Sequence, residues 1–125
     1  EVNVRLLTKG GCAAIWFHWN PGRGGHVLRI CQDAISLATD SADGMTVVGS
    51  LPAAQRIQAG WTAHVRIEVV AGIVKVYRGR DLAGELKLPP GSPATGKIRL
   101  GIDVEPQGGE TPFSVAFADL TVRSL

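Results

Sequence analysis

The sequence predicts an all-β fold, of the kind found in β-sandwiches and β-barrels, from three observations. Sixteen Gly and seven Pro are spread along the 125 residues, so few windows could hold a helix of average length. Between them lie alternating runs rich in β-branched residues, with turn signals about every ten residues. Hydrophobic residues make up 45% of the chain, which argues against disorder. We therefore expect a single sandwich domain over residues 1–125.

The segment 62–78 predicts a β-hairpin that turns at Ala71-Gly72. In this register Glu68 lies directly opposite Lys75 on the polar face, which is mildly stabilising. One register satisfies both faces, because a slip of one residue would expose every apolar side chain. The apolar face then carries Val65, Ile67, Val69, Val74 and Val76.

A second hairpin is predicted from Cys12 to Cys31, with a turn centred at Pro21-Gly22. The same register places the two cysteines opposite each other, where Cα atoms lie about 4.5–5.5 Å apart and a disulfide can form. Two free buried thiols are the alternative. A disulfide would imply a secreted, periplasmic or cell-surface location. The core face of this hairpin would carry Ala13, Ile15, Phe17, Leu28 and Ile30.

Six further segments read as strands, and one as helix. The apolar phase of the last strand shifts near Ala118-Asp119, which predicts a β-bulge. Pro52 could begin one or two helical turns that end before Gly60. Residues 28–38 also fit a helical spacing, but a helix would misplace two of their side chains, so we favour strands. The expected strands are 2–7, 34–38, 46–48, 82–86, 97–104 and 113–123.

Three stretches resemble the jelly rolls of the concanavalin A-like, laminin-G-like families. They are Trp61 with the hairpin 64–79, the run 96–101 (Gly-Lys-Ile-Arg-Leu-Gly), and the closing run 117–122 (Phe-Ala-Asp-Leu-Thr-Val). The resemblance implies a two-sheet antiparallel β-sandwich (jelly roll) of stacked, curved sheets. Trp61 follows the expected helical turn directly, and we expect it in the core. Such modules are found in secreted glycan-active enzymes, lectins, adhesins and the outer sensor regions of bacterial membrane proteins, and the fold alone does not choose among them. The chain is short for this fold, which suggests trimmed loops or a missing first strand.

Charge and hydropathy exclude two classes of partner. Thirteen basic and eleven acidic residues give a net charge of +2, and they are interspersed rather than clustered, so we expect no nucleic-acid partner. The longest run without charged or strongly polar residues, about 10–17, is far short of the roughly 20 residues that span a bilayer. We therefore expect no membrane insertion by this segment.

Catalytic and metal-binding signals are weak. A glycosidase needs two carboxylates, and the Glu-x-Asp-x-x-Glu strand motif of laminarinase-like enzymes is absent. The nearest pair is Asp103 and Glu105, which we interpret as a solvated strand end. The three histidines are not spaced as metal ligands, and the oxygen-rich loop 39–44 is more typical of a turn than of a calcium site. We expect no catalytic residue, no cofactor and no metal site.

A binding patch has better support, on the polar face of the second hairpin. There Trp16, His18 and Arg29 would lie together, and an indole with nearby hydrogen-bond donors can make a shallow glycan site. Arg66 and Tyr77 would extend the patch if both hairpins share one sheet. Alternatively, a loop or the other hairpin covers Trp16. We expect an extracellular, non-catalytic module that binds a glycan or another extracellular ligand; a glycoside-active enzyme, or a domain that binds another protein or itself, are the alternatives.

Overall fold

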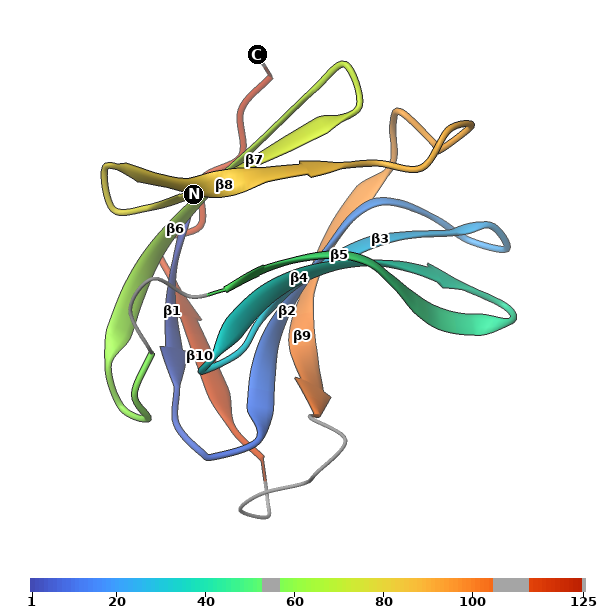
Figure 1. Ribbon diagram of the computed structural model, residues 1–125. Helices are drawn as coiled ribbons and strands as arrows, with labels where there is room; N and C mark the ends of the chain where they lie inside the picture. Colours follow the sequence, from blue (N-terminus) through green and yellow to red (C-terminus); the bar gives the residue numbers. More distant parts are fainter. Residues whose placement is uncertain (53–56, 105–112, 125) are drawn as a thin grey trace.

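The computed structural model describes residues 1–52, 57–104 and 113–124, and within them the chain is all-β without a helix. Two five-stranded antiparallel sheets pack against each other as a β-sandwich (Figure 1). In spatial order, sheet A contains β10 (Val115–Ala118), β1 (Val2–Leu6), β6 (Thr62–Val70), β7 (Ile73–Arg78) and β8 (Asp81–Lys87). Sheet B contains β5 (Gly44–Pro52), β4 (Ala34–Ser41), β3 (Gly24–Ile30), β2 (Gly11–Asn20) and β9 (Lys97–Val104).

The predicted register of the hairpin 62–78 is confirmed, and that of the hairpin 12–31 is confirmed up to Phe17 opposite His26. Beyond Phe17 the pairing shifts by one residue, to Asn20 opposite Gly24, so the turn is not centred at Pro21-Gly22 as predicted. In sheet A, Glu68 of β6 lies opposite Lys75 of β7. In sheet B, Ile15 of β2 lies opposite Leu28 of β3. The predicted disulfide is also present, between Cys12 and Cys31, whose Cα atoms lie 4.4 Å apart. The hydrophobic alternation therefore fixes both registers, because only these pairings turn all the aliphatic side chains inward.

The core lies between the sheets and is built from alternate residues of both. Val4 and Leu6 of β1 and Leu28 and Leu37 of sheet B are completely buried. Burying a side chain of this size stabilises the fold by about 1.5–3 kcal/mol. The same core includes Ile15, Phe17, Ile30, Ile35, Val65, Val74 and Val76.

Several expectations at the ends of elements are corrected. Trp61 is 60% exposed, so it is not a core residue; it lies at the turn before β6. Pro52 is the last residue of β5, so it does not open a helical turn, and residues 53–56 lie outside the described part of the chain. The closing strand is confined to Val115–Ala118. The predicted irregularity after it is found at Asp119, whose φ of 56° lies in the left-handed region.

The loop 39–44 forms a tight hairpin turn. Ser41 pairs with Gly44 across two residues, and the Ser41 hydroxyl oxygen accepts a hydrogen bond from the backbone N–H of Asp43 at 3.3 Å. Ser side chains commonly close turns in this way. The polar composition of this loop is thus accounted for by local structure.

Candidate functional site

A β-bulge near the end of β2 determines which side chains reach the outer face of sheet B. The pairing of β2 with β9 shifts between Trp16, which lies opposite Arg99, and Trp19, which lies opposite Lys97. His18 is the extra residue, and its φ of 52° is uncommon for a residue with a side chain. The bulge breaks the strict alternation of β2, so that Trp16 and Trp19 lie on the same face.

The bulge turns His18 toward the interior, contrary to the prediction that it shares a face with Trp16. Its ring centre lies 5.2 Å from that of Phe17 and 5.9 Å from that of His26. Phe17 and His26 are opposed inner-face residues of β2 and β3. The prediction for His18 was wrong because it assumed that successive side chains of β2 alternate between the two faces without interruption. The extra residue of the bulge reverses the faces from His18 onward.

Two glycines and one amide hold the bulge in place. A Cβ at Gly25 of β3 would lie 2.9 Å from the Cα of Trp19 and 3.0 Å from the carbonyl oxygen of His18. On the other side, a Cβ at Gly96 would collide with the backbone of His18. The Asn20 side-chain amide donates hydrogen bonds to the carbonyl oxygens of His18, at 3.0 Å, and Thr95, at 2.9 Å. Contacts from β2, from β3 and from the residues just before β9 therefore fix the backbone at the bulge, and with it the position of Trp19.

The two indoles share a cation on the outer face of sheet B. The guanidinium carbon of Arg99 lies 5.1 Å from the ring centre of Trp19 and 5.8 Å from that of Trp16. Both distances are within the range of cation–π attraction. Both indoles are half-buried, whereas Arg99 is exposed. This arrangement places two aromatic rings and a hydrogen-bond donor on one open surface.

Trp16 lies along the sheet and covers a small second core. Its indole N–H donates to Oδ2 of Asp40 on β4 at 2.9 Å, while a Cβ at Gly101 of β9 would lie 2.8 Å from its Cζ3. The ring therefore extends from above β9 toward β4, and the missing side chain of Gly101 makes room for it. Beneath it lie the fully buried Ala14, Val27 and Ala38. Trp16 is therefore packed on a second small core, as one of the two alternatives predicted, but its ring is half-buried rather than enclosed.

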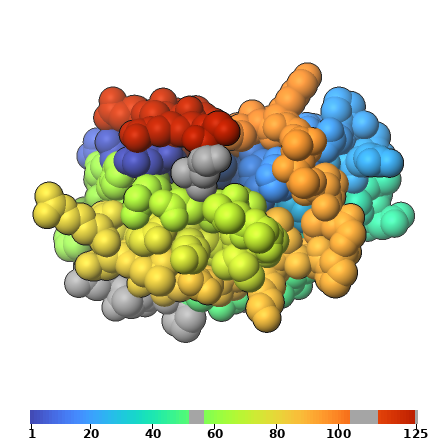
Figure 2. Space-filling model, turned by 90° about the horizontal axis from the view of Figure 1, so that it is seen from above, coloured from blue at the N-terminus to red at the C-terminus, as the bar shows by residue number. Residues whose placement is uncertain are grey.

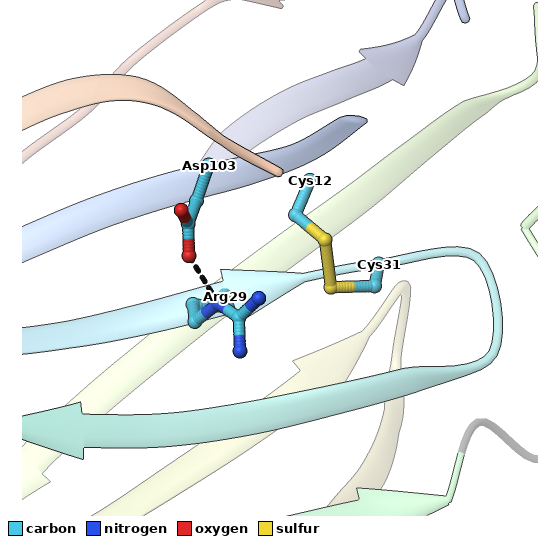
Figure 3. Close-up of a disulfide and its surroundings, with 4 residues drawn as sticks. All are labelled: Cys12, Arg29, Cys31 and Asp103. Carbon is cyan, nitrogen blue, oxygen red and sulfur yellow. Dashed lines mark ion pairs between the residues drawn. A yellow bond between two sulfur atoms is a disulfide. The ribbon is translucent and has the colours of Figure 1, made fainter. Parts of the chain in front are cut away.

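Arg29 also lies on this face, but its guanidinium forms an ion pair with Asp103. Its Nε lies 2.5 Å from Oδ2 of Asp103, in an ion pair beside the Cys12–Cys31 disulfide (Figure 3). The side chain of Arg29 is 15% exposed. Asp103 is thereby occupied by a cation, and the second acid considered for an enzyme, Glu105, lies outside the described residues.

Arg66 and Tyr77 are not brought to this patch, because β6 and β7 belong to sheet A. They lie opposite each other on its outer face, and the Arg66 guanidinium is 4.0 Å from the Tyr77 ring centre. Glu68 joins them, accepting a hydrogen bond from the Tyr77 hydroxyl at 3.4 Å and pairing with Arg66 at 3.2 Å. The five predicted site residues therefore divide among three places: Trp16 with Arg29, the interior with His18, and sheet A with Arg66 and Tyr77.

His26 is a buried polar group without a hydrogen-bond partner among the described residues. It is 2% exposed, and neither of its ring nitrogens is hydrogen-bonded within that part of the chain. Burial lowers the pKa of His26 below its ordinary value of 6.5, and the neighbouring His18 lowers it further. The imidazole is therefore favoured in its neutral form.

Sequence reasoning missed Trp19, Arg99 and Asp40. Regular alternation would place Trp16 and Trp19, three residues apart, on opposite faces, so the spacing gave no indication that they share one. The available signal was the adjacent pair Gly24 and Gly25, because glycine within a strand often marks a bulge or a close backbone approach. Asp40 could not be placed without the contacts between strands.

Within the described residues, no group of three or more His, Cys, Asp or Glu side chains is arranged to hold a metal ion. Over the same residues, none of the secondary structure is a helix suited to crossing a membrane. Comparison with protein-family models, curated proteins and solved structures finds no match to this chain.

Proposed function

We propose that this chain is an extracellular, non-catalytic recognition module that binds a glycan on the outer face of sheet B. The observation that carries the proposal is the placement of Trp16 and Trp19 on one sheet face with Arg99 between their rings in reach of both. Packing does not by itself account for the pair of indoles, because the main core lies on the other face and the small core on this face is covered by Trp16 without Trp19.

The chemistry of these groups suits a sugar. The apolar face of a pyranose stacks on an indole, while its hydroxyls need donors and acceptors at the edge of the ring. Arg99 supplies donors, and the Asp40 carboxylate accepts from Trp16 while keeping further acceptor capacity. The indoles are held by strand packing, so little side-chain freedom would be lost on binding.

The disulfide supports the extracellular part of the proposal. The Cys12–Cys31 bond joins neighbouring strands of sheet B, beside the Arg29–Asp103 ion pair. Disulfides persist in oxidising compartments and are rare in the cytosol. A site on the same sheet would therefore face secreted or surface glycans.

The ion pair also favours recognition over hydrolysis. A glycosidase requires one carboxylic acid that donates a proton and a second carboxylate across the scissile bond. Asp103 is paired with Arg29 at 2.5 Å, so its carboxylate is already engaged by a cation of this chain and is not open toward a substrate.

The proposal is tested on an immobilised glycan array with the wild-type chain, Trp19→Ala and the matched control Trp61→Ala. Trp61 is exposed and outside the patch, so its removal should leave glycan capture unchanged. Trp19→Ala should weaken capture by about tenfold or more, since tenfold corresponds to about 1.4 kcal/mol of lost stacking. Equal capture by the two variants, or no capture by the wild-type chain, would contradict the proposal.

A further inference from the structure

Two cations lie beside the indoles at the β9 edge of sheet B. Lys97 is the cross-strand partner of Trp19, and Arg99 is that of Trp16. Residues two apart on a strand point to the same face, so Lys97 and Arg99 both share the outer face with the indoles. Both cations are exposed. In Figure 2 the chain that leads into β9 (orange) lies at the surface against β2 and β3 (blue).

Two acidic side chains of this face lie away from Lys97 and are engaged within the chain. Asp103 pairs with Arg29, and it lies six residues along β9 from Lys97, about 20 Å at the rise of an extended strand. Asp40 accepts the indole N–H of Trp16 at 2.9 Å. It lies on β4, three strands from β9 and thus about 14 Å across the sheet. Both separations exceed the roughly 8 Å over which exposed charges interact at physiological salt.

The two cations at this edge have no acidic partner in the part of the chain that the structure describes. Neither Lys97 nor Arg99 takes part in an ion pair there. The contact of Arg99 with the Trp19 ring, at 5.1 Å, is a cation–π contact, so it leaves the N–H donors of the guanidinium available. A guanidinium fork matches two oxygens of one oxyanion, and an ammonium adds a point charge. The pair is therefore suited to a carboxylate or a sulfate.

We infer that the glycan bound on this face is anionic, with a uronate carboxylate or a sulfate ester held by Arg99 and Lys97 beside a sugar ring stacked on Trp19. This inference rests on the proposed function, and it names the class of glycan that the same site selects. The anionic group lies at the β9 edge, because Asp40 on the other side of the indoles repels an anion and accepts a neutral hydroxyl instead. The ligand is thereby oriented across the strands, from β9 toward β4.

The test compares two matched pairs of tetrasaccharides on the wild-type chain. Tetragalacturonate and its methyl ester differ in carboxylate charge, and a sulfated carrageenan tetrasaccharide and its desulfated form differ in sulfate. Dissociation constants are measured from the Trp19 indole N–H signal of a ¹⁵N-labelled sample. At least one charged member should bind about three- to tenfold more tightly than its neutral match, the size expected of two solvent-exposed ion pairs. The pair that shows the preference identifies the anionic group as carboxylate or sulfate.

Lys97→Gln tests the charge without removing a stacking group, and Lys87→Gln is the matched control. Lys87 is exposed on β8 of sheet A, so its replacement makes the same change in net charge away from the site. Lys97→Gln should weaken binding of the charged tetrasaccharide about two- to fivefold and leave binding of its neutral match unchanged. Lys87→Gln should leave both unchanged. Raising the ionic strength from about 0.01 to 0.15 M, which shortens the screening length from about 30 to 8 Å, should reduce the preference for the charged member.

Equal affinity for the charged and neutral members of both pairs would overturn the inference. It would also be overturned if Lys97→Gln weakened charged and neutral tetrasaccharides alike, or if Lys87→Gln caused a loss of the same size. If none of the four tetrasaccharides binds, the anionic class is wrong, and glycan capture on the array then decides by itself whether the proposed function holds.

Discussion

Replacing Gly25 with alanine tests whether the bulge that presents Trp19 is held by close backbone packing. The added Cβ would lie 2.9 Å from the Cα of Trp19 and 3.0 Å from the carbonyl oxygens of His18 and Phe17. All three are backbone atoms, so none can swing away as a flexible side chain would. Overpacking of this kind costs about 1–3 kcal/mol, offset by about 0.4–1 kcal/mol from the smaller entropy of the unfolded chain.

The expected net loss is about 1–2 kcal/mol, which for a chain of this size lowers the Tm by roughly 4–8 °C. Thermal unfolding followed by circular dichroism measures it. Gly11→Ala, on the neighbouring strand β2, is the matched control, because its Cβ would meet only side-chain atoms at 3.3 Å or more. That variant should be as stable as wild type or slightly more stable. A Gly25→Ala variant as stable as the Gly11→Ala control would refute the packing argument.

Three further predictions concern Trp16, the disulfide and His26. Trp16→Ala should lower the free energy of unfolding in urea by about 2–3 kcal/mol, between the values for exposed and fully buried aromatic residues, because the half-buried ring also loses its hydrogen bond to Asp40; a loss below about 0.5 kcal/mol would contradict its packing role. Reducing the Cys12–Cys31 bond should lower stability by about 3 kcal/mol, since it closes a loop with a sequence separation of 19 residues; intact mass before and after reduction shows whether the bond is present, and two free thiols would refute it. Because the folded-state pKa of His26 lies below its ordinary value of 6.5, the unfolded state binds its proton first. The contribution of His26 to the free energy of unfolding should therefore be fully present above pH 6.5 and should decrease as the pH falls below 6.5. His26→Phe should reduce this pH dependence of stability. If the pH dependence of the variant equals that of the wild type, His26 is not its cause.

The strands and their registers were predictable because binary patterning is strong in this chain. Ile15 and Leu28 face each other, as do Glu68 and Lys75, in pairings that the alternation alone required. The disulfide followed from the same register. These features depend on local sequence and short turns, where the physical signal is direct.

The site was only partly predictable, because it depends on one irregular residue and on contacts between distant strands. The prediction continued the regular alternation through His18, which placed the His18 side chain on the wrong face. For the same reason Trp19 was not included in the patch with Trp16. The partner strand β9 supplies Arg99 from 80 residues away in the chain, and no local pattern pairs β2 with it. Trp61 was expected in the core and is exposed, because an aromatic residue at a strand start does not by itself determine burial.

The assignment of Arg66 and Tyr77 to the patch depended on which hairpins share a sheet. Each hairpin register is local, whereas the order of strands within a sheet is decided by long-range pairing. The structure places the two hairpins in different sheets, so the two residues form a separate cluster with Glu68. Sheet membership was the information that the sequence pattern lacked.

The indole N–H signals of the protein test the central claim most directly. The chain has three Trp, so a ¹⁵N-labelled sample gives three resolvable side-chain signals. On titration with a glycan captured on the array, the signals of Trp16 and Trp19 should shift together, because both rings lie beside Arg99 on one sheet face. The Trp61 signal should stay in place and serves as the internal control. Shifts confined to Trp61, or saturating binding that leaves Trp16 and Trp19 unmoved, would contradict the account.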